Sequence, residues 1–375
     1  MRQYRLLEIA TQYDQYLRKF YRIHDNFNDL SYDGLFSMVV EDILGPADFI
    51  HRHLRNMGIE SKLVFYNNRN LQRKWNPDLK DKSFFEILIA QIKDFAPDII
   101  FISNMHIFSK EEISAMRESL LPKNVKFVGF HYTTLSTVFL QNAAVYDQIY
   151  TGNSVYADRM RKHGLPAYLL RHAFEPSILY RMPECEKINE LCFSGSIFTG
   201  THVHNNRLDM LDRLIKAGLP YVFFGNIYGS IQDILLEENG KRYIGIIADV
   251  VKNMKQEVFG AEYYSILNNY GICLNMHGGT ADDGVGNMRM FEVTGIGSCL
   301  LTDGREGNSE LFEEDIEIMT YHSFDEMVEK ARWLMEHPKK AREIAVAGQR
   351  KTCKKYTYKN KAECLDTYIQ ELLNG

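Results

Sequence analysis

The sequence predicts an α/β protein of two domains, each built on a parallel β-sheet with helices on both faces. The chain has 375 residues, a length that suits two domains of ordinary size. Short apolar runs alternate with amphipathic segments along most of the chain. This strand–helix–strand rhythm is typical of parallel sheets that are covered on both sides.

Composition places the chain among folded globular proteins and excludes several classes of function. Hydrophobic residues make up 45% of the chain and charged residues 25%, the usual balance for such proteins. The net charge of −5 gives no electrostatic reason to expect a nucleic-acid partner. No apolar run approaches the ~18 residues that cross a bilayer, and the N-terminus lacks the apolar core of a signal peptide. We therefore expect a protein that is not secreted.

Cysteine usage indicates a reducing compartment. The six cysteines form no CxxC pair. Cys192, Cys273 and Cys299 lie in predicted buried strands, where cysteine behaves as a small hydrophobe. A cytoplasmic location is the expectation that follows.

The N-terminal domain is predicted to begin with a helical extension. Apolar residues recur at helical spacing from Leu6 to Phe20, and a second helical segment, 35–57, ends at Gly58. Ser83 and Glu86 form a capping box at the start of a further helix. The alternating elements that follow are strands at 61–66, 99–102, 125–130, 147–150 and 168–170, and helices at 83–95, 110–121 and 154–163.

A segment with two prolines and several charges, 175–188, interrupts this rhythm and is interpreted as the interdomain linker. A second α/β series follows, and a last helix at 359–373 closes the chain. The pattern alone supports two Rossmann-like domains. The predicted elements of the second series are strands at 190–193, 221–224, 271–275, 298–302 and 317–319, and helices at 205–217, 261–269, 287–294, 324–336 and 339–356.

Polar loops follow three predicted strands of the second series. They contain Gly195-Ser196, the stretch from His277 to Gly286, and Asp303-Gly304. Loops at the carboxyl ends of parallel strands are where α/β sheets hold ligands. Glycine lets a phosphate approach the backbone, and serine adds a donor. Ordinary strand-ending turns explain these residues equally well, and the absence of GxGxxG excludes a dinucleotide fingerprint.

Three charged residues lie on the helices that follow these loops. Arg207 begins one helix, and arginine suits bidentate contact with phosphate. Arg289 and Glu292, three residues apart, share one face of another helix. A carboxylate offers two acceptor oxygens to a vicinal diol. The simpler alternative is an intrahelical ion pair that contributes little.

Histidines provide candidates for acid–base chemistry in the N-terminal domain. His106 and His131 each follow a predicted strand, which puts both at the carboxyl edge of the sheet. Histidine accepts a proton near neutral pH, although a structural role for each is an equally good interpretation. His131 ranks first because a polar run, 132–134, follows it. Weaker candidates are Asp147, Tyr32 and Trp75.

His202 and His204 have a spacing that invites a metal interpretation, but no third ligand is evident. We therefore expect no metal site and interpret both as loop histidines.

Several segments carry a family resemblance. They are Phe193-Ser-Gly195-Ser196, Asn206-Arg207, Asn287-Met-Arg-Met-Phe-Glu292, Gly295-Ile-Gly297, Leu300-Leu-Thr-Asp303 and Glu310-Leu-Phe312. Together they resemble the CgeB-like glycosyltransferases, relatives of the GT-B enzymes. The resemblance covers roughly residues 145–360 and is looser in the N-terminal third.

The resemblance implies a GT-B fold, in which two Rossmann-like domains face each other across a cleft and the C-terminal helix packs back toward the N-domain. It implies an acceptor domain at 1–180, a nucleotide-sugar donor domain at 188–356 and a C-terminal helix at 357–375. The implied activity is metal-independent transfer of a sugar from a nucleotide-sugar donor to a glycan, lipid-linked or protein acceptor, in cell-surface polysaccharide or glycoconjugate biosynthesis. No other cofactor is implied. Peripheral membrane association and the oligomeric state stay open.

The resemblance also assigns roles to the candidate residues. Gly195-Ser196, Arg207 and Arg289 would lie beside the donor diphosphate, and Glu292 would accept hydrogen bonds from ribose. His277, Asp303 and Gly304 would lie near the donor as well, and a neutral His131 or His106 near the acceptor.

The chain departs from the related family-4 enzymes, which carry two glutamates eight residues apart. Gly284 stands where the first glutamate would be, and replacement by Asp282 or Asp283 stays open. Two other functions also stay open: a nucleotide-sugar epimerase of the same fold, and a non-catalytic sugar-binding or coat-assembly protein. Retention or inversion of the anomeric configuration does not follow from the sequence.

Overall fold

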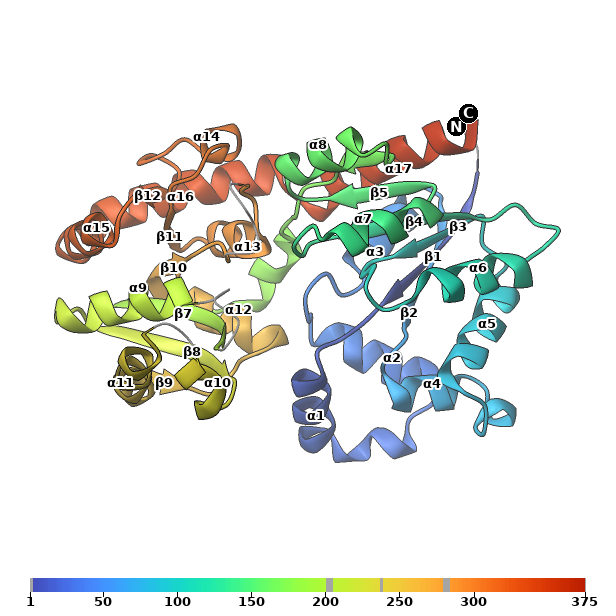
Figure 1. Cartoon of the computed structure of the whole chain (residues 1–375), viewed down its shortest axis with the longest axis horizontal. Coiled ribbons are helices and arrows are strands. Elements are labelled where there is room, and N and C mark those ends of the chain that lie inside the picture. The colour runs from blue at the N-terminus through green and yellow to red at the C-terminus, as the bar shows by residue number, and fades with distance from the viewer. Residues whose placement is uncertain (1–2, 200–204, 237–238, 279–283, 375) are drawn as a thin grey trace. The chain divides into compact units, whose positions relative to one another are not determined.

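The computed structural model of the chain consists of two compact units (Figure 1). It describes residues 3–199, 205–236, 239–278 and 284–374. Unit 1 comprises Met1–Arg171 and Tyr358–Gly375, and unit 2 comprises His172–Thr357. Each unit contains a six-stranded sheet whose neighbouring strands are all parallel. The prediction of two parallel α/β domains is confirmed.

The sheet of unit 1 has the strand order β2-β1-β3-β4-β5-β6. Its strands are β1 (Arg5–Ala10), β2 (Glu60–Phe65), β3 (Ile99–Ile102), β4 (Lys126–His131), β5 (Gln148–Thr151) and β6 (Ala167–Leu169). Its α-helices are α1 (Asp14–Ile23), α2 (Tyr32–Glu41), α3 (Phe49–Asn56), α4 (Arg69–Trp75), α5 (Phe84–Phe95), α6 (Lys110–Ser119), α7 (Thr137–Asn142), α8 (Ser154–Lys162) and α17 (Tyr358–Asn374), with short 3₁₀ helices η1 (Asp25–Asp29), η2 (Pro77–Leu79) and η3 (Ala143–Val145).

The predicted helical N-terminal extension is wrong for Arg5–Ala10, because β1 lies between β2 and β3 inside the sheet, whereas α1, α2 and α3 lie in the rest of it. Leu6 and Leu7 point to opposite faces, and both are fully buried. A short apolar run that is buried on both faces has no alternation to distinguish it from a helix. Glu8 also occupies this strand, and its carboxylate is held by His51 at 2.9 Å.

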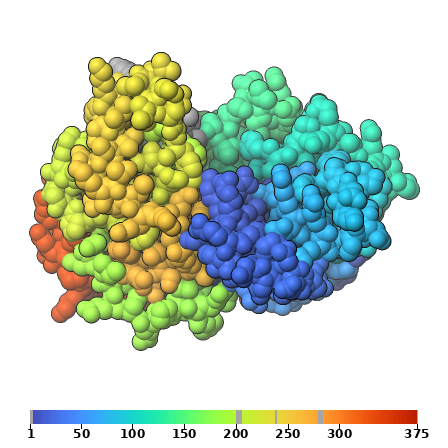
Figure 2. Space-filling model, turned by 90° about the horizontal axis from the view of Figure 1, so that it is seen from below, coloured from blue at the N-terminus to red at the C-terminus, as the bar shows by residue number. Residues whose placement is uncertain are grey.

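Helices cover both faces of this sheet. Residues of α5, α6 and α8 share one apolar cluster with the strands. Helices α3 and α17 lie on the other side. The hydroxyl of Tyr4, the residue directly before β1, donates to Asp366 of α17 at 3.0 Å. The C-terminal helix therefore packs on the N-terminal unit, as predicted. In Figure 2 the blue N-terminal segments lie beside the light-blue α4 region, where Lys74 donates to the carbonyl of Leu30 at 2.8 Å.

The sheet of unit 2 has the strand order β12-β11-β10-β7-β8-β9. Its strands are β7 (Ile188–Phe198), β8 (Tyr221–Tyr228), β9 (Met254–Lys255), β10 (Tyr270–Asn275), β11 (Cys299–Asp303) and β12 (Met319–Tyr321). Its helices are η4 (Pro176–Arg181), α9 (Asn205–Lys216), α10 (Ile231–Leu236), α11 (Gly240–Val250), η5 (Val251–Asn253), α12 (Gly260–Asn269), α13 (Met288–Ile296), α14 (Asn308–Leu311), α15 (Phe324–Glu336) and α16 (Pro338–Lys355).

The direction of strand progression reverses between β7 and β10. From β7 the chain moves outward through β8 and β9, and it returns to the other side of β7 at β10. Such a reversal opens a crevice at the carboxyl ends of the two strands, and ligands of doubly wound sheets bind there. The topology therefore selects the tips of β7 and β10 as the first place to look for a site. Among the described residues, no helix combines the length and apolarity needed to cross a membrane.

The boundaries of the compact units differ from those of the predicted domains. Unit 2 begins at His172, so it includes residues 172–180. It also includes the helix η4, which lies within the predicted linker 175–188. Phe174 explains this, because its ring is fully buried and its amide donates to the carbonyl of Tyr356 at 2.8 Å. A Cβ added to Gly295 of α13 would lie 2.2 Å from that ring. Helix α13 can approach Phe174 only because it carries glycine there.

We expect Gly295→Ala to lower the free energy of unfolding by about 1–3 kcal/mol, because the new methyl overlaps the Phe174 ring. The matched control is Gly245→Ala in α11, where nothing lies within 4 Å of the added Cβ. That control should be neutral or stabilise by up to about 1 kcal/mol, since alanine is the better helix former. Urea titration of the full chain measures both changes. Equal stability of the two variants would contradict the packing described for Phe174.

Candidate active site

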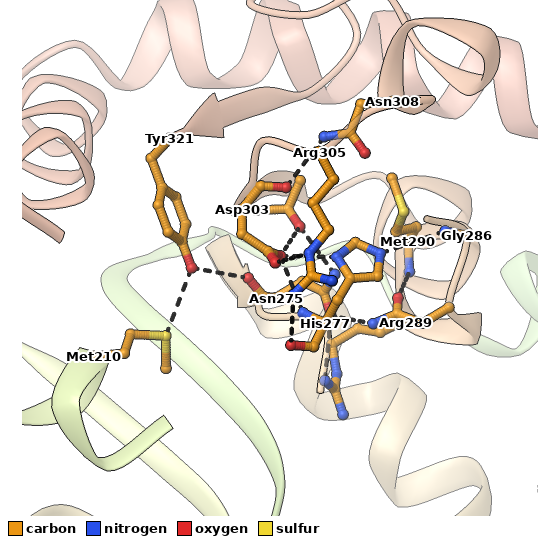
Figure 3. A network of polar contacts seen from close by, with 12 residues as sticks. Met210, Asn275, His277, Gly286, Arg289, Met290, Asp303, Arg305, Asn308 and Tyr321 are labelled. Carbon is orange, nitrogen blue, oxygen red and sulfur yellow. Dashed lines mark hydrogen bonds and ion pairs between the residues drawn. The ribbon is translucent and has the colours of Figure 1, made fainter. Parts of the chain in front are cut away.

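The predicted donor residues of unit 2 gather where the strand order reverses. Gly195 and Ser196 come from β7, and Asp303 comes from the end of β11. Arg207 lies on α9 and Arg289 on α13, the helices that follow β7 and β10. Figure 3 shows His277, Arg289 and Asp303 converging on the tip of β10. Parallel topology, rather than sequence proximity, brings these residues together.

Two arginines meet at Gly195. A Cβ built on Gly195 would lie 3.2 Å from Nη2 of Arg289 and 3.8 Å from Nη1 of Arg207. Arg207 donates to the carbonyl of Ser196 at 2.6 Å. Within the described part of the chain, neither guanidinium forms an ion pair, and the buried Nε of each has no acceptor. Burial, followed by the charge of Arg289, lowers the pKa of Arg207. The charge of Asp303 acts in the opposite direction, but it forms no ion pair with either arginine, and the two like charges form a positive site.

Asn275, at the end of β10, holds this part of the site in place. It is fully buried, and its Oδ1 accepts from Asn287 at 2.9 Å and from Nη1 of Arg289 at 3.4 Å. Its amide nitrogen donates to Thr302 of β11 at 3.0 Å. Asn287 is the N-cap of α13 and accepts from the amide of Met290. The sequence interpretation missed Asn275, although an asparagine that ends an apolar strand is a usable signal.

His277 is fixed by a carboxylate. Its Nδ1 lies 2.8 Å from Oδ1 of Asp303, so Nδ1 carries the proton that is donated. Oδ2 of Asp303 accepts from Nε of Arg305 at 2.6 Å. His277 is buried, and its Nε2 accepts a long bond of 3.4 Å from the amide of Gly286. Arg305 also was missed from the sequence. Its role is to hold Asp303, and through it the imidazole, in one orientation (Figure 3).

Glu292 has tyrosine partners instead of an ion pair with Arg289. Its Oε2 accepts from Tyr263 at 2.8 Å, and its Oε1 accepts from Tyr264 at 3.4 Å. The side chain is only 5% exposed. Burial raises the pKa of Glu292, although the hydrogen bond from Tyr263 and the charge of Arg289 act in the opposite direction. The intrahelical ion pair that the sequence left open is therefore not the arrangement of this helix.

The predicted turn at Gly195-Ser196 is instead part of a strand. β7 continues to Phe198 and pairs with β8 as far as Tyr228. Ser196 Oγ donates to Glu257 at 3.3 Å, and Tyr228 donates to both oxygens of Glu257 at 2.8 Å. Glu257 follows the short strand β9 and was not foreseen. It orients the serine side chain at the strand tip.

Gly304 does not offer a backbone donor to the site. Its amide donates to the carbonyl of Tyr321 at 2.7 Å. A Cβ at Gly304 would lie 2.3 Å from the ring of His322. Both contacts are structural. The amide of Gly304 is therefore not available for the expected contact with the nucleotide-sugar.

The two candidate histidines of unit 1 lie next to each other, with ring centroids 5.6 Å apart. His131 is fully buried against Phe139, which contradicts its expected exposure as a site residue. Burial, followed by the charge of His106, lowers the pKa of His131 to about 3. His106 is exposed, and its Nε2 lies 2.6 Å from Oγ1 of Thr133. Of the two, His106 is therefore the one that solvent and a ligand can reach.

The weaker candidates of unit 1 have structural surroundings. Asp147 accepts from the amide of Phe127 at 2.7 Å and from Arg117 at 3.0 Å. Tyr32 stacks on Phe36, and Trp75 lies below the ammonium group of Lys62. His202, His204, Asp282 and Asp283 lie outside the described residues. Among the described residues, no group of three potential ligands is placed to hold a metal ion.

Asp303 allows a test of this network by pH. Burial alone would raise its pKa, but the hydrogen bond and charge of His277 and the charge of Arg305 outweigh it and lower the pKa to about 2. A carboxyl whose pKa is lower in the folded state than in the unfolded state stabilises the fold at pH values above its unfolded pKa. This contribution is lost as the pH falls toward 2. Asp303→Asn should therefore cost about 2 kcal/mol of unfolding free energy at pH 7 and progressively less below pH 4.

The matched control is Asp325→Asn, at a surface carboxyl whose side chain is 70% exposed. It should change stability by less than about 0.5 kcal/mol at either pH. Urea titrations at several pH values between 2 and 7 measure both variants. A difference between wild type and Asp303→Asn that does not depend on pH would refute the assignment.

Comparisons with known proteins bear on the family of unit 2 and on the fold. The family model described as "Glycosyl transferase-like" matches residues 207–366. No curated protein sequence matches the chain. Among solved structures, the chain is similar to a glycosyltransferase from Rickettsia africae ESF-5, with 10% identity, a TM-score of 0.59 and coverage of 100% of this chain and 99% of that one.

Two further structures show the same fold. HepE of Anabaena, in complex with UDP-glucose, has 10% identity and a TM-score of 0.61, covering 98% of this chain and 100% of its own. Sucrose-phosphate synthase from Thermosynechococcus elongatus has 8% identity and a TM-score of 0.57, with both chains covered completely. Residues 207–366 therefore match a glycosyl transferase-like domain, and the chain as a whole has the GT-B fold of these solved glycosyltransferases.

Proposed function

We propose that unit 2 holds a nucleotide-sugar by its diphosphate and that the chain transfers the sugar to an acceptor bound by unit 1. The convergence of Arg207 and Arg289 on Gly195 is the observation that carries this proposal. Two guanidinium groups next to a residue without a side chain fit an anion that approaches the backbone. A diphosphate supplies several oxygens for the bidentate contacts that arginine makes best.

The neighbouring residues favour a nucleotide over inorganic phosphate. Glu292 lies one helical turn after Arg289, and its carboxylate suits a sugar hydroxyl. HepE is similar in fold and holds UDP-glucose, so UDP-sugars come first among the donors we propose. The positions of the CgeB-like resemblance, Asn287 to Glu292, form the start of helix α13 that presents both side chains. This supports our finer assignment to that branch.

The chemical role of the arginines follows from where charge develops. When the glycosidic bond to the diphosphate breaks, the leaving group gains negative charge, and fixed positive groups stabilise it. Arg207 and Arg289 are held in position by Ser196 and Asn275 before any donor binds. We propose that they perform this task without a metal ion.

His277 is proposed to contact the donor sugar. Because Nδ1 donates to Asp303, Nε2 is the acceptor, and its long contact with Gly286 is easily exchanged for a sugar hydroxyl. The described acid nearest to it, Asp303, is already committed to His277 and Arg305.

Unit 1 is proposed to bind the acceptor, a glycan, a lipid-linked saccharide or a protein, in surface glycoconjugate synthesis. His106 is its best candidate for a base, because it is exposed and bonded to Thr133 at the carboxyl edge of the sheet. The six free cysteines support the cytoplasmic location that we propose for this reaction.

Arg207→Ala and Arg289→Ala should each weaken binding of nucleoside diphosphates by about 10- to 100-fold, the worth of a hydrogen bond to a charged group. Calorimetry with UDP, GDP, dTDP and CDP measures this loss. The matched control is Arg213→Ala, which removes a 45% exposed arginine from the same helix as Arg207. It should leave affinity unchanged.

Four outcomes would decide against the proposal. Equal loss in the control would mean that helix α9 merely contributes net charge. Unchanged affinity in both site variants would place the diphosphate elsewhere. If the wild-type chain binds nucleotides but neither transfers nor hydrolyses the sugar, it is a binding protein. Conversion of the nucleotide-sugar into another nucleotide-sugar without acceptor would identify an epimerase.

His106→Ala should lower turnover of the nucleotide-sugar whose nucleotide binds in the calorimetry above by about 100-fold, the lower end of what a general base contributes. It should change nucleotide affinity little. His131→Phe is the comparison, because it replaces one buried ring with another. It should retain most of the turnover. Release of nucleoside diphosphate measures both rates. A larger loss in His131→Phe than in His106→Ala would restore the original ranking.

A further inference from the structure

A pocket of about 190 Å³ lies at the amino ends of the central strands of unit 2. Its lining includes Ile188, the first residue of β7, and Gly271, the second residue of β10. The first two turns of α16 form another part of the lining. The residues of the proposed donor site lie at the carboxyl ends of the same strands. Gly271 and Asn275 are about 13 Å apart along β10, so a small molecule in the pocket does not reach the donor site.

The lining combines an apolar surface with two cations. Its apolar side chains are those of Ile188, Ile272, Pro338, Ala341 and Ala345. The charged residues of the lining are Lys187 and Arg342, and no described acid belongs to it. Glu184 and Glu186, in the adjoining chain, are exposed. Among the residues that the structure describes, neither cation forms an ion pair. An anionic ligand would therefore supply a charge that the pocket lacks.

The two cations differ in how far their donors are used. Nζ of Lys187 donates to the carbonyl of Asn268, to its Oδ1 at 3.4 Å and to Oγ of Ser298 at 3.3 Å, so its N–H groups all have acceptors. In the described part of the chain, Arg342 makes one long bond of 3.4 Å, from Nη1 to the carbonyl of Gly297. These contacts place each cation near the end of a helix, α12 or α13, which stabilises that helix. They leave most of the guanidinium donors of Arg342 for a ligand.

We propose that this pocket binds a small carboxylic acid with an apolar body, whose carboxylate pairs with Arg342 beside the charge of Lys187. A planar guanidinium matches the two oxygens of a carboxylate. The volume slightly exceeds the roughly 150 Å³ of a cavity that holds benzene, so the ligand has the size of benzoate or hexanoate. A phosphate monoester carries a charge of about −1.5 to −2. It loses more hydration than a singly charged carboxylate on entering an apolar pocket.

The test uses benzoate and hexanoate as probes, titrated into the full chain and followed by calorimetry. The wild type should bind at least one of them with a Kd of about 1 mM or lower, because small ligands gain much free energy per atom. Benzamide, which has the shape of benzoate without its charge, should bind about 10-fold more weakly or worse. Phenyl phosphate should also bind more weakly than benzoate, because its second charge is costly to desolvate.

Arg342→Gln should weaken binding of the carboxylate about 10-fold or more, because a hydrogen bond between charged groups is lost. Arg342 is exposed, so this variant should fold normally. The matched control is Arg350→Gln, which removes another exposed arginine of α16 that does not line the pocket. It should keep the wild-type affinity. Ala345→Leu should abolish binding by filling the pocket, and its melting temperature shows whether it is folded.

Four outcomes would overturn this proposal. They are the absence of saturable binding of either carboxylate to the wild type at about 10 mM, equal affinity in Arg342→Gln and the wild type, an equal loss in Arg350→Gln, and tighter binding of phenyl phosphate than of benzoate. The last would indicate a phosphate site instead. None of these measurements involves a nucleotide, so their failure leaves the proposed function standing.

Discussion

Two positive charges held close together, those of Arg207 and Arg289, are the feature on which the site of unit 2 depends. Like charges near one another, partly withdrawn from water, are unfavourable, and the lowered pKa of Arg207 records this. The fold nevertheless keeps them there, because each is bonded to a neutral acceptor on a strand tip, Ser196 or Asn275. A binding site for an anion is a coherent reason to maintain such an arrangement, since the ligand supplies the missing charge.

The nearby acids form no ion pair with these arginines in the described part of the chain, although the charge of Asp303 raises the pKa of Arg207 and the charge of Arg289 lowers the pKa of Glu292. Asp303 directs both oxygens to His277 and Arg305, and Glu292 is bonded to tyrosines. Each carboxylate therefore has its own partner within hydrogen-bond distance. The end of the sheet therefore has a positive site near β7, formed by the two arginines, and a second group at β11, in which the charges of Asp303 and Arg305 are paired. This second group fixes the imidazole of His277.

The fold class and the grouping of the donor residues were predictable, because a parallel sheet collects its polar strand ends on one edge whatever their separation in sequence. Local geometry was not. The apolar residues of β1 also fit a helix, because a strand buried on both faces shows no alternation. The residue types at Gly195-Ser196 predict a turn, whereas pairing with β8 continues past them. His131 follows its strand as a site residue would, yet whether a strand-end histidine points outward or into the core depends on Phe139, which packs on it from another element.

The position eight residues before Glu292 shows why a family pattern has to be checked against the atoms. Gly284 is buried there, at the position where the family-4 pattern of the resemblance would place the first carboxylate. Among the described residues near it, the acid Asp303 is already fully engaged. In the donor complex that we propose, a sugar hydroxyl would meet the Nε2 acceptor of His277 in place of a carboxylate. A neutral acceptor attracts a hydroxyl less strongly than a charged one. It also adds no negative charge next to the diphosphate, and this favours the same positive site that the two arginines create.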